Sequence, residues 1–333
     1  MTPTPLAPAP VTGRLRTGLR TLAILSCLPY IAIKAAWICG SRLGIPAGSS
    51  LLDHRTTMIV ANSTSVLMDG AVVVIALLLT RPRGRRLPAW LLVPPIWVAT
   101  GLLLPIMTGY PLQLLVRAGG GKTLAHDAAR PFLDAWVFGV VYTGFILQGV
   151  ALGTLFVLYA KDRWGHLWAG TLRGLPDTPT TPALRAGAVA ASLAALVPGT
   201  THLLWATGST AGLNASRTAE RSSDFYALEA VDVLFVVLMV AGVLLLAFRR
   251  GSATPLRVPL ALAWAGSGAT GCWGGWLCLA SLGSVADIAD RPTPAMVLTY
   301  AVQMLAGTLV VTLGAYFLAE RAAGARPPSG LRA

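Results

Sequence analysis

Charge is scarce in this chain. Only 12% of its 333 residues are Asp, Glu, Lys or Arg, about half the share found in an ordinary soluble domain. The 26 basic residues outnumber the 13 acidic residues, which gives a formal net charge of +13. The arginines stand in short blocks between apolar runs. The excess positive charge therefore argues against a nucleic-acid partner and favours loops that lie near anionic lipid headgroups.

Cysteine and histidine are also rare, with four residues of each. No two cysteines have C-x-x-C spacing, and no two histidines have the H-E-x-x-H spacing of a zinc site. The sequence therefore predicts no disulfide framework and no metal site, and we interpret the cysteines as small packing residues. The cysteines are Cys27, Cys39, Cys272 and Cys278, and the histidines are His54, His126, His166 and His202.

Signature motifs for nucleotide, acyl and diphosphate chemistry are absent or incomplete. The stretch Ala118–Thr123 ends like a phosphate-binding loop, but the first glycine of that motif would fall on Val116. The sequence contains no G-x-S-x-G nucleophile elbow and no D-D-x-x-D motif, which argues against serine-hydrolase and diphosphate-ionising prenyl chemistry. The sequence accordingly predicts no cofactor.

What the chain has in abundance is long apolar runs. Hydrophobic residues make up 55% of the sequence, and the mean hydropathy is +0.67. A helix satisfies its own backbone in lipid, and about 20 residues suffice to cross the hydrocarbon core. The sequence therefore predicts an all-α fold, a polytopic transmembrane helix bundle of eight spans. The spans are 21–40, 56–80, 88–110, 132–160, 183–207, 225–248, 256–281 and 294–318.

The distribution of positive charge predicts the orientation of these spans. Most of the 26 Lys and Arg residues lie in the tails and in the loops after the second, fourth and sixth spans. The strongest block is Arg81-Pro-Arg83-Gly-Arg85-Arg86. Because cytoplasmic loops carry an excess of Lys and Arg, both termini are predicted to be cytoplasmic. The expected location is the bacterial inner membrane, crossed several times.

A duplicated motif predicts an internal repeat. The pattern W-x-x-G-S-x-x-G occurs at residues 37–44 and again at 205–212. At a similar offset, Trp97 and Gly101 match Trp264 and Gly268. We predict two parallel four-helix repeats, 21–160 and 183–320, related by an axis along the membrane normal. A cytoplasmic linker, 161–182, joins them, and cytoplasmic tails, 1–20 and 321–333, flank them.

Several stretches resemble a group of actinobacterial polytopic membrane proteins. The resemblance covers most of the chain and is clearest in the first four spans. It implies a helical membrane fold and an inner-membrane location, and it brings no activity and no catalytic residues. The residues that carry it are Leu28-Pro29-Tyr30, Lys34, Trp37, Asp53-His54-Arg55, Asn62, Asp69 and Trp164-Gly165-His166-Leu167-Trp168.

Ionisable residues inside the apolar runs are candidates for function. A charged side chain at the centre of a span costs on the order of 2.5–3.5 kcal/mol on insertion scales, so it needs a reason. Asp69 lies near the middle of the second span, and Glu229 and Asp232 share one helical face of the sixth. These three carboxylates are candidate proton carriers or general acids. Lys34 and His202 hold equivalent places in the first and fifth spans.

The predicted repeat also aligns Asn62 with Glu229 and Ser65 with Asp232. We therefore predict a polar cavity between the two halves that opens to the extracytoplasmic side, with Asp69 as its floor. Asp53 and His54 are expected near its mouth. The candidate substrate-binding residues are Lys34, His202, Asn62, Asp134, Trp37 and Trp205.

Each of these candidates has a structural alternative. Lys34 can extend its ammonium group to the lipid headgroups, Glu229 can be an interfacial residue, and His202 can be a hydrogen-bonded helix contact. An ion pair of Lys34 with a carboxylate would serve structure and function equally well. The glycine-rich stretch 271–275 is interpreted as a close helix contact rather than as a ligand site.

Three functions are compatible with this pattern. The first is a transporter or permease for a small or amphipathic solute, proton-coupled through the intramembrane carboxylates. The alternative is a membrane-embedded enzyme that performs acid–base chemistry on a lipid-soluble substrate, such as an isoprenoid or terpene cyclase or an isomerase. The third is a non-catalytic membrane partner in a larger complex. The expected partners are the lipid bilayer and the substrate, and a homo-oligomer is compatible with the sequence.

Overall fold

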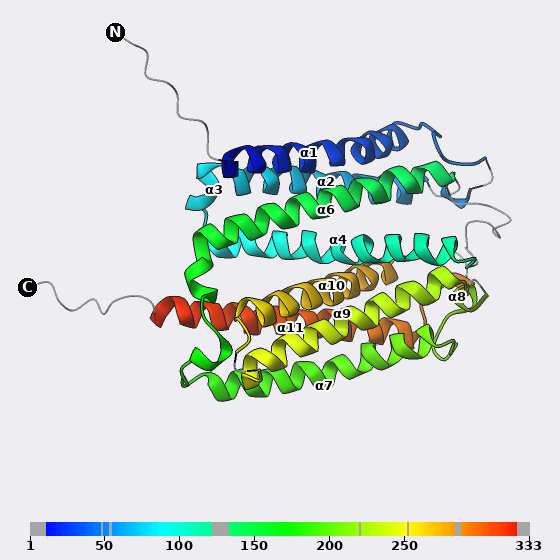
Figure 1. Cartoon of the computed structure of the whole chain (residues 1–333). Coiled ribbons are helices and arrows are strands. Elements are labelled where there is room, and N and C mark those ends of the chain that lie inside the picture. The colour runs from blue at the N-terminus through cyan, green and yellow to red at the C-terminus, as the bar shows by residue number, and fades with distance from the viewer. Residues whose placement is uncertain are drawn as a thin grey trace, which may run out of the picture. The chain divides into compact units, whose positions relative to one another are not determined.

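The fold is helical throughout the part of the chain that the computed structural model describes (Figure 1). The described residues are 11–47, 49–52, 55–121, 133–219, 221–251, 253–283 and 288–324. Among them there are helices, turns and one isolated bridge between Thr171 and Pro255, and no strand. The prediction of an all-α polytopic helix bundle is confirmed.

Eight long helices and several short ones make up the described chain. The long helices are α1 (Val11–Ile38), α2 (Arg55–Thr80), α4 (Ala89–Ala118), α6 (Ala135–Trp164), α7 (Thr181–Ala206), α9 (Ser223–Phe248), α10 (Arg257–Ser281) and α11 (Pro294–Gly324). The short α-helices are α3 (Pro82–Arg86) and α8 (Ala215–Ala219). The 3-10 helices are η1 (Ser50–Leu52), η2 (Gly165–Trp168), η3 (Leu172–Gly174) and η4 (Ile288–Asp290).

Seven of the long helices in the described chain are long and apolar enough to cross a membrane. Helix α10 is not among them, although it coincides with the predicted seventh span. Its sequence contains several Gly, Ser and Thr residues, which lower its hydropathy below that of its neighbours. The multi-pass membrane character is therefore supported, whereas the count of eight spans and the cytoplasmic termini stay predictions.

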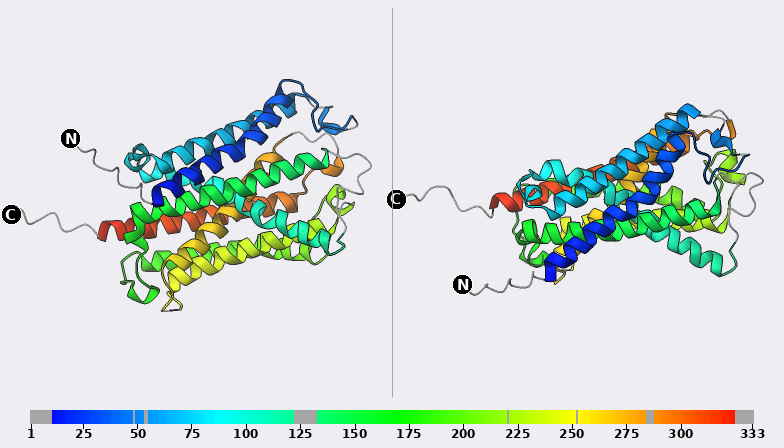
Figure 2. Two further views of the ribbon diagram at one scale, coloured as in Figure 1. Left: turned by 45° about the horizontal axis from the view of Figure 1, so that its top comes forward. Right: turned by 90° about the horizontal axis from the view of Figure 1, so that it is seen from above.

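The chain divides into two compact units. Unit 1 comprises residues 1–96 and 129–163, and unit 2 comprises residues 97–128 and 164–333. The boundary falls inside α4, so that this helix belongs to unit 2 from Trp97 onward. Helix α1 lies beside α2 in unit 1, and α7 lies beside α9 in unit 2, as the left view of Figure 2 shows.

Glycines allow the helices of unit 2 to approach closely. A Cβ atom on Gly271 would lie 3.1 Å from the Cα atom of Gly307, and one on Gly274 would lie 2.7 Å from the carbonyl oxygen of Tyr300. Helices α10 and α11 are therefore in backbone contact. The interpretation of the glycine-rich stretch as a close helix contact is confirmed.

The contact between α4 and α10 in unit 2 is reciprocal. The indole nitrogen of Trp97 donates to the Ser267 hydroxyl at 3.2 Å, and that of Trp264 donates to the Thr100 hydroxyl at 3.2 Å. Both helices carry the pattern W-x-x-[S/T]-G, and its glycines meet: a Cβ atom on Gly101 would lie 2.4 Å from the carbonyl oxygen of the matching glycine on α10. The same kind of contact is therefore made twice, with the roles of the two helices exchanged.

The first copy of W-x-x-G-S-x-x-G ends α1 in a fixed turn. Gly40 has φ +93°, a left-handed conformation that favours glycine. The amide of Gly40 donates to the carbonyl of Trp37, and that of Ser41 donates to the carbonyl of Ala36, which is the Schellman pattern of a helix C-terminus. The Trp37 indole then donates to the carbonyl of Leu43 at 2.7 Å and holds the loop against the helix end.

The second copy ends α7 in the same way. Gly208 has φ +101°, its amide donates to the carbonyl of Trp205, and the Ser209 amide donates to the carbonyl of Leu204. The Trp205 indole donates to the carbonyl of Ala211 at 2.9 Å. The duplicated sequence thus folds into duplicated local structure. The full four-helix repeat beyond these matching contacts stays a prediction.

Candidate functional site

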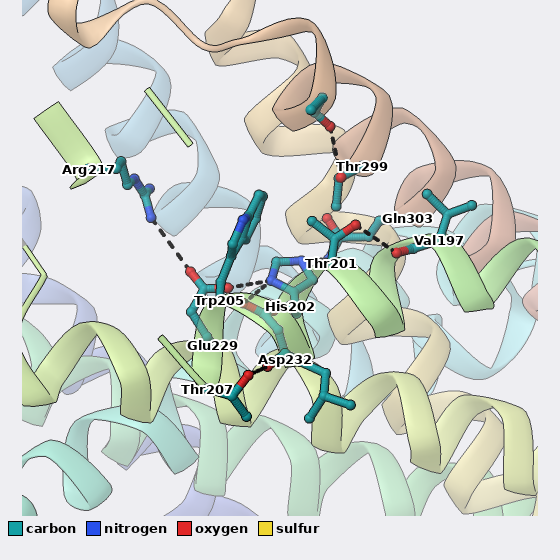
Figure 3. A network of polar contacts seen from close by, with 12 residues as sticks. Val197, Thr201, His202, Trp205, Thr207, Arg217, Glu229, Asp232, Thr299 and Gln303 are labelled. Atoms are coloured by element: carbon teal, nitrogen blue, oxygen red, sulfur yellow. Dashed lines mark hydrogen bonds and ion pairs between the residues drawn. The ribbon is translucent and has the colours of Figure 1, made fainter. Parts of the chain in front are cut away.

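Unit 2 contains a buried imidazole–carboxylate pair (Figure 3). His202 lies near the end of α7, and Glu229 lies near the start of α9. The Nδ1 atom of His202 is 2.5 Å from the Oε2 atom of Glu229, and both residues are buried. Asp232, one turn further along α9, places its Oδ2 atom 3.8 Å from the same nitrogen. The structure therefore brings these three predicted site residues together.

Gln303 of α11 contacts the second nitrogen of the imidazole. Its Nε2 atom is 2.9 Å from the Nε2 atom of His202, and the residue is only 1% exposed. With the amide in this orientation, its N–H donates to the Nε2 lone pair. The imidazole is then neutral and donates its Nδ1 proton to Glu229. Among the described residues, the Oε1 atom of Gln303 has no hydrogen-bond partner.

One side of this network is closed and the other is partly open. Trp205 is buried and presents its ring edge-on to the imidazole, with 5.3 Å between the ring centroids. Asp232, in contrast, has a side chain that is 29% exposed. Asp232 is therefore more exposed than His202 and Glu229.

The start of α9 is anchored, and this anchoring positions Glu229. The hydroxyl of Ser222 accepts a hydrogen bond from the Phe225 amide and caps the helix. Asp224 in the first turn is buried and pairs with Arg117 of α4 at 2.6 Å, where a carboxylate also complements the helix dipole. Arg217 of α8 places its guanidinium 3.8 Å from Oε1 of Glu229, which is a weak, partly exposed interaction.

Unit 1 holds a different polar centre. Asp69 of α2 and Gln148 of α6 are both buried, and the Nε2 atom of Gln148 donates to Oδ1 of Asp69 at 3.3 Å. The remaining oxygens, Oδ2 of Asp69 and Oε1 of Gln148, have no hydrogen-bond partner among the described residues. The predicted mid-span carboxylate is therefore paired with an amide.

Lys34 does not pair with a carboxylate. Its ammonium nitrogen lies 5.0 Å from the ring centroid of Tyr30 and 4.8 Å from that of Trp37. No ion pair of Lys34 occurs within the described ranges. Lys34 makes cation–π contacts instead, because two aromatic faces on the same helix lie within reach of the flexible side chain.

The other predicted binding residues are spread over unit 1. Asn62 is buried within α2, and Trp37 is buried at the end of α1. Asp134 is exposed and directly precedes α6. Asp53 and His54 lie outside the described residues. Asn62, Trp37 and Asp134 all belong to unit 1, and the cavity between the two halves stays a prediction.

Two glutamines were missing from the sequence-based candidates. Gln148 and Gln303 each contact a predicted proton carrier or its imidazole partner, yet neither carries a charge. A usable signal was present, because each is a polar side chain inside a run of apolar residues. Arg217 was also missed, since its sequence position in a loop gives no indication of its approach to Glu229.

The unit 2 network also has the residue types of a metal site. The ligand atoms of His202, Glu229 and Asp232 all lie within 4.8 Å of one another. The Nδ1 atom of His202 and the Oε2 atom of Glu229, however, are in direct hydrogen-bond contact at 2.5 Å, and a metal ion would have to take the nitrogen lone pair and separate the two atoms. The geometry is that of a hydrogen-bonded acid–base pair.

The described helices support a multi-pass membrane protein with one buried polar centre in each unit. Comparison with protein-family models, with curated proteins and with solved structures finds no match. The function is therefore argued from the chemistry of these two centres.

Proposed function

We propose that the protein transports a small or amphipathic solute across the membrane and that proton movement through the unit 2 network drives this transport. The observation that carries the proposal is the buried hydrogen bond between His202 and Glu229, with the carboxylate of Asp232 at 3.8 Å from the same imidazole. Buried ionisable groups in a spanning helix are retained at a cost and mark proton relays and substrate pathways.

The network can hold one proton more or fewer without repacking its helices. When the imidazole is neutral, the Gln303 amide donates to Nε2 of His202. When the imidazole is protonated, rotation of the same amide by half a turn presents its Oε1 atom to the new N–H. The oxygen that has no partner in the described structure then gains one. This amide therefore supports both protonation states of the histidine.

The charge of the network favours cationic or neutral solutes over anions. Two carboxylates face one imidazole, and the nearby guanidinium of Arg217 is partly exposed and 3.8 Å away. Glu229 lies roughly 9 Å along the helix axis from Ser223, the first residue of α9. The positive-inside pattern predicts that this end faces outward, so protons would enter the network from the extracytoplasmic side.

Transport by the full-length chain in proteoliposomes tests the proposal. The lumen carries a pH indicator, and a panel of amphipathic amines is added outside. We expect solute-dependent proton flux with the unaltered chain and at least a tenfold loss with Glu229→Gln, because that change removes the proton acceptor and keeps the side-chain shape. Asp177→Asn is the matched control, since Asp177 is an exposed carboxylate that pairs with Arg249. Solute uptake that is indifferent to the pH gradient would contradict proton coupling.

A membrane-embedded acid–base enzyme is the second candidate. It is favoured by the hydrogen-bonded pair of His202 and Glu229, which is an acid–base unit beside the aromatic edge of Trp205. Isoprenoid lipids mixed with the same proteoliposomes and analysed by mass spectrometry distinguish the two functions. A cyclised or isomerised product that disappears with Glu229→Gln supports the enzyme, and solute-coupled proton flux supports the transporter.

A further inference from the structure

Unit 1 contains two buried oxygen atoms whose hydrogen bonding is incomplete. Oδ2 of Asp69 and Oε1 of Gln148 are buried, and neither has a hydrogen-bond partner within the described part of the chain. The two residues are only 4% and 1% exposed. Their other polar atoms are already joined, with Nε2 of Gln148 donating to Oδ1 of Asp69 at 3.3 Å. Buried oxygens without partners are rare in folded proteins and call for an explanation.

An ionised carboxylate does not explain this arrangement. It would leave a full negative charge in a buried site with a single long hydrogen bond, which is a costly state. The titratable groups that interact with the Asp69 charge are Cys27, Tyr30 and Lys34, all on α1. Lys34 is the cation among them, and its ammonium lies over aromatic rings rather than against the carboxylate. From α6, the side chain that contacts Asp69 is the uncharged amide of Gln148.

One proton satisfies both oxygens. A carboxylic acid and a primary amide are complementary, because each offers one donor and one acceptor on the same edge. A proton on Oδ2 of Asp69 can be donated to Oε1 of Gln148 while Oδ1 continues to accept from Nε2. We propose that Asp69 binds a proton and that Gln148 holds the neutral acid in a cyclic, doubly hydrogen-bonded pair. The step adds one proton to one carboxylate, and no other bond forms or breaks.

A metal cation fits the site less well than a proton. Hard cations such as Ca²⁺ take about six to eight oxygen ligands, whereas this site offers the oxygens of one carboxyl and one amide. A bound proton avoids this shortage of ligands, because it needs only a donor oxygen and an acceptor oxygen.

The role of this pair as a second protonation site of the transporter rests on the proposed function. Proton binding at Asp69 itself can be measured without any transport. Infrared spectroscopy of the full-length chain in proteoliposomes reports the carboxylic-acid C=O band in H₂O and in D₂O. We expect, at pH 7, an acid band that shifts on deuteration and is lost in Asp69→Asn. Asp177→Asn, an exposed carboxylate outside the site, should leave that band unchanged.

A swapped variant tests the pairing itself. Asp69→Asn/Gln148→Glu moves the acid from α2 to α6 and keeps one acid facing one amide, so the deuteration-sensitive acid band should return. Asp69→Asn alone replaces the acid by an amide that can make the same two hydrogen bonds, so its unfolding temperature should match that of the unaltered chain. Asp69→Leu leaves both polar atoms of the Gln148 amide unpaired and should lower that temperature.

Each contrary outcome is identifiable. If Asp69→Asn removes a carboxylate band instead of an acid band at pH 7, the aspartate is ionised and the proposal is overturned. If replacing potassium by sodium shifts the band assigned to Asp69, the site binds a cation instead of a proton. Should Asp69→Asn fail to fold, ¹³C labelling of aspartate carboxyls in an Asp232→Asn background identifies the band, and absence of a labelled acid band overturns the proposal. None of these results depends on solute flux, so they are separable from failure of the transport assay.

Discussion

The polar centres of the two units both contain a buried glutamine, but the titratable group that this glutamine contacts differs between them. In each unit, a fully buried glutamine from the last long helix has its amide nitrogen engaged and its Oε1 atom unpartnered within the described residues. In unit 1 the glutamine meets a lone carboxyl, Asp69, whereas in unit 2 it meets His202, which is itself hydrogen-bonded to Glu229. The comparison indicates that a glutamine amide can hydrogen-bond either a carboxyl group or an imidazole.

The two units also differ in the contacts of a basic residue that precedes the duplicated motif. Lys34 and His202 hold equivalent positions, each three residues before the tryptophan of the duplicated motif. Lys34 contacts aromatic rings, and His202 contacts a carboxylate. The helix ends around them are alike in geometry. The two helix ends therefore share one backbone geometry and carry different side-chain chemistry at this position, and substitutions can measure the consequence.

The largest expected difference is between His202→Ala and Lys34→Ala. Removing His202 leaves the buried carboxylate of Glu229 without its hydrogen-bond partner, which we expect to lower the free energy of unfolding by about 3–5 kcal/mol. Removing Lys34 loses cation–π contacts worth about 0.5–2 kcal/mol. Thermal unfolding in detergent, followed by tryptophan fluorescence, measures both. His166→Ala serves as the control, because His166 is an exposed histidine. Equal losses for the two substitutions would remove the distinction between the centres.

A smaller and equal effect is expected from Gly40→Ala and Gly208→Ala. Both glycines have positive φ, and neither position is crowded. The cost is therefore the backbone strain of alanine in a left-handed conformation, about 1–2 kcal/mol in each case. Measured by the same unfolding assay, matched losses would confirm that the two copies of the motif play the same structural role. A loss confined to one copy would show that the helix ends are not equivalent.

The smallest effect is expected at the reciprocal contact of α4 and α10. Trp97→Phe and Trp264→Phe each remove one indole N–H that donates to a hydroxyl at 3.2 Å. A net loss of about 1 kcal/mol is expected for each hydrogen bond, and the two losses should agree because the contacts are symmetric. Gly101→Ala is the matched contrast, since its Cβ atom would meet backbone at 2.4 Å and should be far more damaging. Clearly unequal tryptophan losses would show that the two contacts are not equivalent.

The apolar runs predict the eight long helices of the described chain, because a spanning helix must be apolar over most of its length. They do not predict the short helices such as α3 and α8. The ends were less well predicted: α1 begins at Val11, well before the predicted start at residue 21, since charged arginines do not stop a helix. Helix α10 coincides with a predicted span, but its small polar residues leave it less apolar than the seven helices that qualify as spans in the described chain.

The site was only partly predictable from charge. Glu229 and Asp232 stood out as acids on one face of an apolar helix, and the equivalence of His202 to Lys34 stood out through the repeat. The glutamines did not stand out, because a search for ionisable groups passes over neutral amides. Whether Lys34 contacts a carboxylate or two aromatic rings depends on the distances between helices, and these distances cannot be read from the sequence.

The most direct test of proton-coupled transport asks whether a solute gradient alone generates a pH gradient across the membrane. Proteoliposomes that contain the full-length chain are loaded with a transported amine, placed at equal pH inside and outside, and diluted. We expect that the lumenal pH changes as the solute leaves, and that Glu229→Gln abolishes the pH change while Asp177→Asn preserves it. Solute efflux with no change of lumenal pH would contradict the claim that the His202–Glu229 pair couples protons to transport.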